Sequence, residues 1–147
     1  MTDLSDFARL VALDHGLCIV STLTARGAIQ STLVNAGVLT HPASGQPVVG
    51  LVARGGSRKL AHLRARPDAT VAVRAGWDWV TAAGTAELIG PDDPYPGIDA
   101  ERLRVLLREV FTAAGGTHDD WPTYDATMAN ERRAAVLVTP TSVYSNG

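Results

Sequence analysis

The sequence has very few residues that could form cross-links or membrane anchors. Its 147 residues include one cysteine, Cys18, so no disulfide can form within the chain. Cys18 lies in the apolar run from Leu17 to Val20, which predicts a buried and unreactive thiol. No uninterrupted apolar run reaches the roughly 18 residues of a membrane span, and the acidic N-terminal segment lacks a long apolar core. We therefore expect a cytoplasmic protein without a signal peptide or a membrane span.

The chain also lacks a large excess of either positive or negative charge. The net charge is −2 at pH 7, and no basic stripe with interleaved aromatic residues occurs, which argues against a nucleic-acid-binding function. Apolar residues make up 46% of the chain, enough to bury a sizeable core at this length. We expect one domain over residues 1–147 that binds neither nucleic acid nor a membrane.

Several well-defined catalytic motifs are missing. The sequence has no G-x-S-x-G pattern, which argues against an exposed serine nucleophile. It has no G-x-G-x-x-G or G-x-x-x-x-G-K pattern either, which argues against dinucleotide-binding and P-loop folds. The four histidines lack metal-ligand spacing, so no metal site is predicted. No side chain can be assigned a catalytic role from these patterns.

The hydrophobic periodicity predicts four helices and six or seven short strands. The expected helices are residues 4–15, 57–64, 99–114 and 119–130. The expected strands are residues 17–24, 28–39, 46–53, 69–74, 77–89, 134–139 and 143–145. The helices do not alternate strictly with the strands, which favours the α+β class, and short strands need paired edges. We therefore expect a small closed or half-closed antiparallel β-barrel.

A glycine pair opens a short basic helix at Arg54-Gly55-Gly56-Ser57-Arg58-Lys59, and Lys59 is the only lysine in the chain. Ser57 is a candidate N-cap, so free backbone N–H groups, the helix dipole and two cationic side chains would converge on one point. Such a point suits a phosphate group. From local sequence alone, a solvated surface helix capped by Ser57 explains the same residues equally well.

Two further groups of residues stand out in the predicted strands. Gln30, Thr32 and Asn35 interrupt an otherwise apolar strand, where an unpaired buried polar group costs about 1 to 3 kcal/mol. Either a heteroaromatic ligand or the backbone at a barrel rim would supply their partners. Trp77 and Trp79 are two residues apart and are expected on the same face of one strand. Core packing, a planar ligand or a dimer interface would each suit this tryptophan pair.

Together, these features resemble the split β-barrel flavin and deazaflavin oxidoreductases typified by pyridoxamine-phosphate oxidase. More narrowly, they resemble the actinobacterial branch that uses the deazaflavin coenzyme F420. The resemblance covers nearly the whole chain and rests on the order and spacing of many segments. These are residues 30–35, 54–59, 63–69, 76–80, 84–88, 116–121, 124, 128, 132–133 and 143–144.

The resemblance implies an antiparallel split β-barrel with flanking helices and a homodimer whose cofactor groove lies at the subunit interface. It implies hydride transfer from C5 of the reduced deazaflavin to an unsaturated small molecule. The implied cofactor-binding residues are Gln30, Thr32 and Asn35 along the ring, Ser57, Arg58 and Lys59 at the phosphate, and Arg54, His62, Trp77 and Trp79 near the tail, the ring or the opposite subunit. Some relatives have an arginine at the position of Ser57, and Arg58 would replace it from the next position.

Two alternatives fit the same sequence. The first keeps the fold but uses FMN, as an oxidase of an amine or of a phosphorylated pyridoxine vitamer. The second is a non-catalytic protein that binds or carries the deazaflavin. In the enzymatic cases the cofactor supplies the redox chemistry, so the absence of an assignable acid–base pair excludes none of them.

Overall fold

The computed structural model describes residues 1–146, in which four helices surround a six-stranded barrel. The helices are α1 (Leu4–Val11), α2 (Arg58–Ala65), α3 (Ala100–Ala113) and α4 (Trp121–Asn130). The strands are β1 (Leu17–Leu23), β2 (Ile29–Thr40), β3 (Pro47–Ala53), β4 (Asp68–Ala75), β5 (Asp78–Ile89) and β6 (Ala134–Ser145). The predicted α+β class and antiparallel barrel are confirmed.

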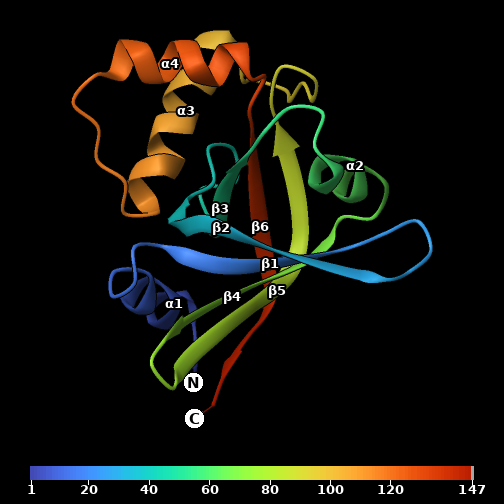
Figure 1. Ribbon diagram of the computed structural model, residues 1–147, viewed down its shortest axis with the longest axis vertical. Helices are drawn as coiled ribbons and strands as arrows, with labels where there is room; N and C mark the ends of the chain where they lie inside the picture. Colours follow the sequence, from blue (N-terminus) through green and yellow to red (C-terminus); the bar gives the residue numbers. More distant parts are fainter. Residues whose placement is uncertain (147) are drawn as a thin grey trace.

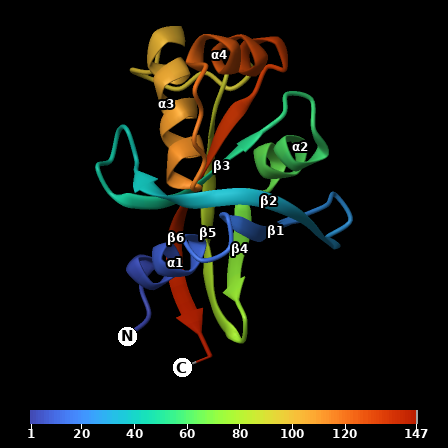
Figure 2. The same ribbon diagram turned by 60° about the vertical axis from the view of Figure 1, so that its left-hand side comes forward.

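The barrel closes in the strand order β1-β2-β3-β6-β5-β4, and every neighbouring pair is antiparallel. Strand β2 changes partner along its length, because residues 29–35 pair with β1 whereas residues 36–40 pair with β3. As a result, the tip of the β1–β2 hairpin projects sideways from the barrel, below α2 in the view of Figure 1 and again beside α2 in Figure 2. The two chain ends described by the structure lie near one another at the opposite end from α4 (Figure 1).

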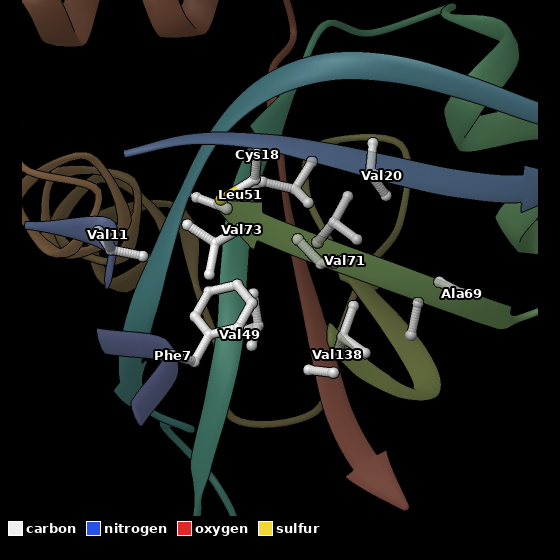
Figure 3. Close-up of a cluster of buried hydrophobic side chains, with 14 of the residues drawn as sticks. Phe7, Val11, Cys18, Val20, Val49, Leu51, Ala69, Val71, Val73 and Val138 are labelled. Atoms are coloured by element: carbon white, nitrogen blue, oxygen red, sulfur yellow. The ribbon is translucent and has the colours of Figure 1, made fainter. Parts of the chain in front are cut away.

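The barrel interior is filled by alternate residues of the strands and by one side of α1. Phe7 of α1 is fully buried among Cys18, Leu51 and Val73, and Figure 3 shows these side chains converging inside the barrel. Helix α1 begins at a capping box in which the Asp3 carboxylate accepts a hydrogen bond from the Ser5 N–H. The predicted burial of Cys18 is confirmed, and burial raises the pKa of its thiol to about 12.

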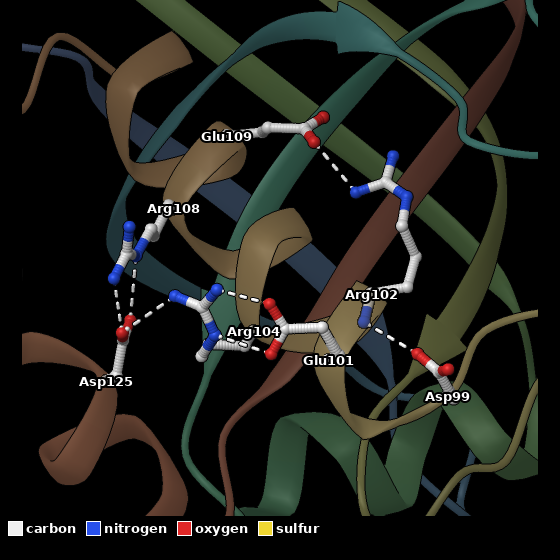
Figure 4. Close-up of polar contacts among 7 residues, drawn as sticks. All are labelled: Asp99, Glu101, Arg102, Arg104, Arg108, Glu109 and Asp125. Carbon is white, nitrogen blue, oxygen red and sulfur yellow. Dashed lines mark hydrogen bonds and ion pairs between the residues drawn. The ribbon is translucent and has the colours of Figure 1, made fainter. Parts of the chain in front are cut away.

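A second apolar cluster lies under α3 and α4, outside the barrel. Leu106 and Val110 of α3 pack with Leu137 of β6 and Val48 of β3. On the outer side of α3, Arg104 and Arg108 both form ion pairs with Asp125 of α4 (Figure 4). These contacts hold α3 and α4 as one unit over the β2–β3–β6 part of the barrel.

The structure corrects three predicted boundaries. The first helix ends at Val11 rather than residue 15, because the chain turns there and reaches left-handed conformations at His15 and Gly16. Residues 134–145 form one strand instead of two. Pro140 fits because it lies beyond the part of β6 that pairs with β3 and opposite Gly84, where the β5–β6 ladder already shifts its register.

The third correction concerns the tryptophan pair. Gly76 and Trp77 form a two-residue turn between the paired residues Ala75 and Asp78, and Gly76 has a positive φ of 63°. Trp77 therefore lies outside β5 with 93% of its surface exposed, whereas Trp79 lies within β5 and packs edge-on against Tyr144. The predicted shared strand face does not form.

None of the helices within residues 1–146 is long and apolar enough to cross a membrane. The same residues contain no cluster of three or more histidine, cysteine, aspartate or glutamate side chains that could hold a metal ion.

Candidate functional site

A cavity of about 590 Å³ opens between the segment after β3, the middle of β2, and the ends of α3 and α4. We call it the basic pocket. Its polar lining consists of Asn35, Arg54, Ser57, Lys59, His118, Tyr124 and Arg133. Its volume falls within the range of about 300 to 1,000 Å³ that is usual for small-molecule and cofactor sites.

The glycine pair positions the cationic edge of this pocket. Gly55 donates its N–H to Glu131 O at 3.0 Å, and an added Cβ at this position would lie 2.6 Å from Arg132 O. Only a glycine allows this close approach. Gly56 has a φ of 76°, which turns the chain so that Ser57 can cap α2, where its Oγ accepts the Leu60 N–H at 3.4 Å. The predicted N-cap is confirmed, and the start of α2 borders the pocket.

Sheet register brings a second cation to the same edge. Ala53 at the end of β3 pairs with Ala134 at the start of β6, so the next residues outward, Arg54 and Arg133, are neighbours. Arg133 is partly neutralised by Glu131, to which its Nε donates at 2.9 Å. Within residues 1–146, Lys59 and Arg54 form no ion pair with a carboxylate. The pocket edge therefore carries uncompensated positive charge.

Lys59 lies where its surroundings disfavour its positive charge. It is half-buried, and burial together with repulsion from Arg133 lowers the pKa of its ammonium group. An anion bound between Lys59, Arg54 and the N-terminus of α2 would stabilise the charged ammonium and so offset both effects. The donor set of this edge fits a phosphate group.

The opposite wall of the pocket is aromatic. The Phe111 ring lies 5.0 Å from the Tyr124 ring and 6.2 Å from His118, and Met128 completes this side. His118 Nδ1 accepts the Asp120 N–H at 2.9 Å, so in the neutral ring the proton resides on Nε2. The basic pocket thus combines an anion-binding edge with a wall that can pack against a planar ring.

Tyr124 joins this wall to the helices behind it. Its hydroxyl donates to Leu107 O at 2.9 Å inside the second apolar cluster, and burial raises its pKa to about 12. We expect Tyr124→Phe to lower the free energy of unfolding by about 1 kcal/mol, because Leu107 O loses a buried donor. Urea unfolding checks this, with the exposed Tyr144→Phe as the control that should leave stability unchanged. Equal effects of the two variants would contradict the prediction.

The structure distributes the ten sequence-predicted cofactor residues unevenly. Asn35, Arg54, Ser57 and Lys59 line the basic pocket. Asn35 also donates its side-chain N–H to His15 O at 2.9 Å, which is the backbone pairing at a barrel rim that the sequence allowed as an alternative.

The other six predicted residues lie outside the lining of the pocket. Arg58 is exposed on α2, and His62 turns toward the barrel, where its Nδ1 lies 3.1 Å from Thr22 Oγ1. Gln30 and Thr32 lie on the projecting hairpin, and Trp77 and Trp79 belong to the β4–β5 hairpin, whose turn lies at the end of the barrel opposite α4 (Figure 1). No contact within one chain tests their proposed roles, so these remain predictions.

Sequence reasoning did not assign the lining residues Arg133, Phe111, His118, Tyr124 and Met128 to the site. All except Phe111 belong to segments that carried the family resemblance, but nothing in their local pattern indicated a pocket. The four-residue spacing of Tyr124 and Met128 is that of ordinary helix packing. The pairing of β3 with β6 places Arg133 at the pocket, and this pairing cannot be predicted from local sequence.

Known structures share this fold at low sequence identity, although no protein-family model matches the sequence. A conserved hypothetical protein from Mycobacterium tuberculosis superposes with a TM-score of 0.70 and 19% identity, over 99% of this chain and 84% of that one. A pyridoxamine 5′-phosphate oxidase-related, FMN-binding protein from Nostoc punctiforme gives 0.64 and 13%, over 96% and 80%. A protein described as an F420 reductase gives 0.60 and 14%, over 91% and 93%.

The fold by itself does not select the bound group. A heme-binding protein from Mycobacterium smegmatis also superposes, with a TM-score of 0.65 and 18% identity over all of this chain and 55% of that one. At such identities the similarity establishes architecture, not activity. The chain has the fold of the pyridoxamine 5′-phosphate oxidase-like split β-barrels.

Proposed function

We propose that this protein is an oxidoreductase that binds the deazaflavin coenzyme F420 in the basic pocket and reduces an unsaturated small molecule. The observation that carries the proposal is the uncompensated positive charge of Arg54 and Lys59 at the N-terminus of α2, facing an aromatic wall in the same cavity. A phosphate-bearing ring cofactor matches both halves of this arrangement. The similarity to a protein described as an F420 reductase supports the choice of cofactor.

In this proposal the chain binds and orients, and the bound deazaflavin supplies hydride chemistry at its ring. Lys59 and Arg54 hold the phosphate with charge-assisted hydrogen bonds, and the N-terminal N–H groups of α2 complete the anion site. Phe111 and Tyr124 exclude water from one side of the cavity. His118, with its proton on Nε2 in the neutral ring, lines the same cavity and can donate a hydrogen bond there.

FMN is the second candidate, because a similar structure is described as FMN-binding and FMN also joins a phosphate to a planar ring. Titrating the purified protein with F420 and with FMN distinguishes the two cofactors. Tight FMN binding without F420 binding would exclude the deazaflavin proposal. The protein is then incubated with reduced F420 and each of a panel of quinones, enones and nitroaromatics, and the oxidation of F420 is followed. Saturable F420 binding without oxidation would indicate a carrier rather than an enzyme.

We further propose that two copies of this chain associate through the outer face of the barrel formed by β2, β1, β4, β5 and β6. Apolar side chains are exposed on this face, including Ile19, Leu33 and Ile29, which are 42%, 64% and 74% exposed. The residues between them are small or hydroxylated. Two cross-strand rows of the face are Leu33-Ile19-Ala72-Thr81-Tyr144 and Ser31-Ser21-Thr70-Ala83-Ser142.

The charges on this face favour a second copy as the partner. Asp68 and Arg74 lie on the same side of β4, about 20 Å apart at the usual strand rise, and neither forms an ion pair within residues 1–146. A two-fold axis through the middle of β4 would bring Asp68 of each copy against Arg74 of the other. The β1–β2 hairpin, which contributes Ile29 and Leu33 to this face, also carries Gln30 and Thr32. We place the predicted groove between subunits along these two residues.

Charge reversal tests this arrangement. We expect Asp68→Arg to weaken dimerisation about 5- to 30-fold, because two attractive contacts become repulsive at roughly 0.5 to 1 kcal/mol each. The double variant Asp68→Arg/Arg74→Asp should restore dimerisation, since the pairs form again with exchanged signs. Sedimentation velocity over a dilution series measures the dissociation constant. A monomeric wild-type protein, or a double variant no better than the single one, would overturn the proposed interface.

A further inference from the structure

Lys59 has the surroundings of a reactive amine. It is the only lysine in the chain, it is half-buried, and it lines the basic pocket beside Arg54 and Arg133. Within residues 1–146 it has no carboxylate partner. It also occupies the second position of α2, where the positive end of the helix dipole disfavours an ammonium group.

The burial of Lys59 and its cationic surroundings shift it toward its neutral form. Removal from water destabilises the charged ammonium, Arg133 repels it, and both effects lower its pKa. The neutral amine has a free electron pair and is the form that attacks carbonyl carbon. An anion paired directly with Lys59 would act in the opposite direction and keep its ammonium group protonated. The amine is therefore reactive toward an aldehyde whose phosphate is held by Arg54 and Arg133 and not by Lys59 itself.

We propose that Lys59 forms a reversible imine with small aldehydes that carry a phosphate group, and that this modification competes with cofactor binding. The electron pair of Nζ adds to the aldehyde carbon, and the resulting carbinolamine loses water to give the C=N bond. Water is the only other product, so no oxidant or reductant is needed. Arg54 and Arg133 would hold the phosphate of the aldehyde, so this inference rests on the proposed anion-binding role of the pocket.

The single lysine makes the test direct. The whole protein is incubated with glyceraldehyde 3-phosphate or with glyceraldehyde, each with cyanoborohydride to trap the imine, and peptides are quantified by mass spectrometry. We expect Lys59 to be labelled at least tenfold faster by the phosphorylated aldehyde, with protection by inorganic phosphate. The Met1 α-amine serves as the internal reference and should react with the two aldehydes at similar rates. Lys59→Arg keeps the positive charge and should abolish labelling at this position.

The outcomes separate this inference from the proposed function. Equal rates at Lys59 with the two aldehydes, or a rate no greater than that of Met1, would overturn it even if F420 binds. Preferential labelling by the phosphorylated aldehyde in a protein that binds neither F420 nor FMN would support it and reject the cofactor proposal. If both are correct, F420 protects Lys59 from labelling and the trapped adduct loses F420 affinity at least tenfold. If the protein carrying the trapped adduct at Lys59 binds F420 with unchanged affinity, the proposed competition between imine formation and cofactor binding is refuted.

Discussion

Replacing Lys59 by alanine is expected to weaken F420 binding about 10- to 150-fold. Each hydrogen bond from a charged group contributes about 1.5 to 3 kcal/mol, and 1.4 kcal/mol corresponds to a factor of ten in affinity. Lys59 lines the basic pocket at the N-terminus of α2 and has no competing carboxylate within residues 1–146. A fluorescence titration of the cofactor measures the change, and FMN is titrated in parallel.

Arg58 provides the matched control for this variant. It is the neighbouring cation on the same helix, yet it is exposed and does not line the pocket. Arg58→Ala should change affinity less than threefold, which is the range of a weak surface charge effect. Neither variant should alter the free energy of unfolding by more than about 0.5 kcal/mol. A larger loss of affinity in Arg58→Ala than in Lys59→Ala would move the phosphate site to the outer side of α2.

The local parts of this site were predictable from sequence. Gly56 and Ser57 act through a positive φ and one hydrogen bond to Leu60, three residues away, so their pattern predicts the turn and the N-cap. The barrel class was predictable for a similar reason, because strand length and turn spacing are local properties. The resemblance to split-barrel oxidoreductases added the cofactor-binding residues, of which the structure brings Asn35, Arg54, Ser57 and Lys59 to one cavity.

The far side of the pocket was not predictable, because it depends on pairing between distant strands. Arg54 and Arg133 become neighbours only through the register Ala53↔Ala134, which joins strands about 80 residues apart in sequence. The prediction that Trp77 and Trp79 share a strand face was wrong for a local reason. Period-two alternation assumes a continuous strand, and the tight turn at Gly76 removes Trp77 from β5.

Packing at Gly37 links the stability of the fold to the shape of the pocket. An alanine Cβ at this position would lie 2.0 Å from Ala113 O and 2.3 Å from Ala113 C, which are backbone atoms of α3. No side-chain rotation can relieve such a contact, so α3 must move away from β2. The end of α3 carries Val110, Phe111 and Ala114, which line the pocket. We therefore expect Gly37→Ala to lower the free energy of unfolding by about 3 kcal/mol, at the upper end of the usual cost of overpacking.

Gly50 is the matched control, because it is the direct partner of Gly37 across β2 and β3. Its added Cβ would meet Leu39 Cδ2 at 2.5 Å and Leu137 Cδ2 at 3.3 Å, and these side-chain ends can rotate away. Gly50→Ala should therefore cost only about 1 kcal/mol. Urea unfolding compares the two variants, and cofactor titration of the folded fraction should show weaker binding for Gly37→Ala alone. Equal destabilisation by the two substitutions would mean that the end of α3 is not held against β2, and that the aromatic wall is free to move.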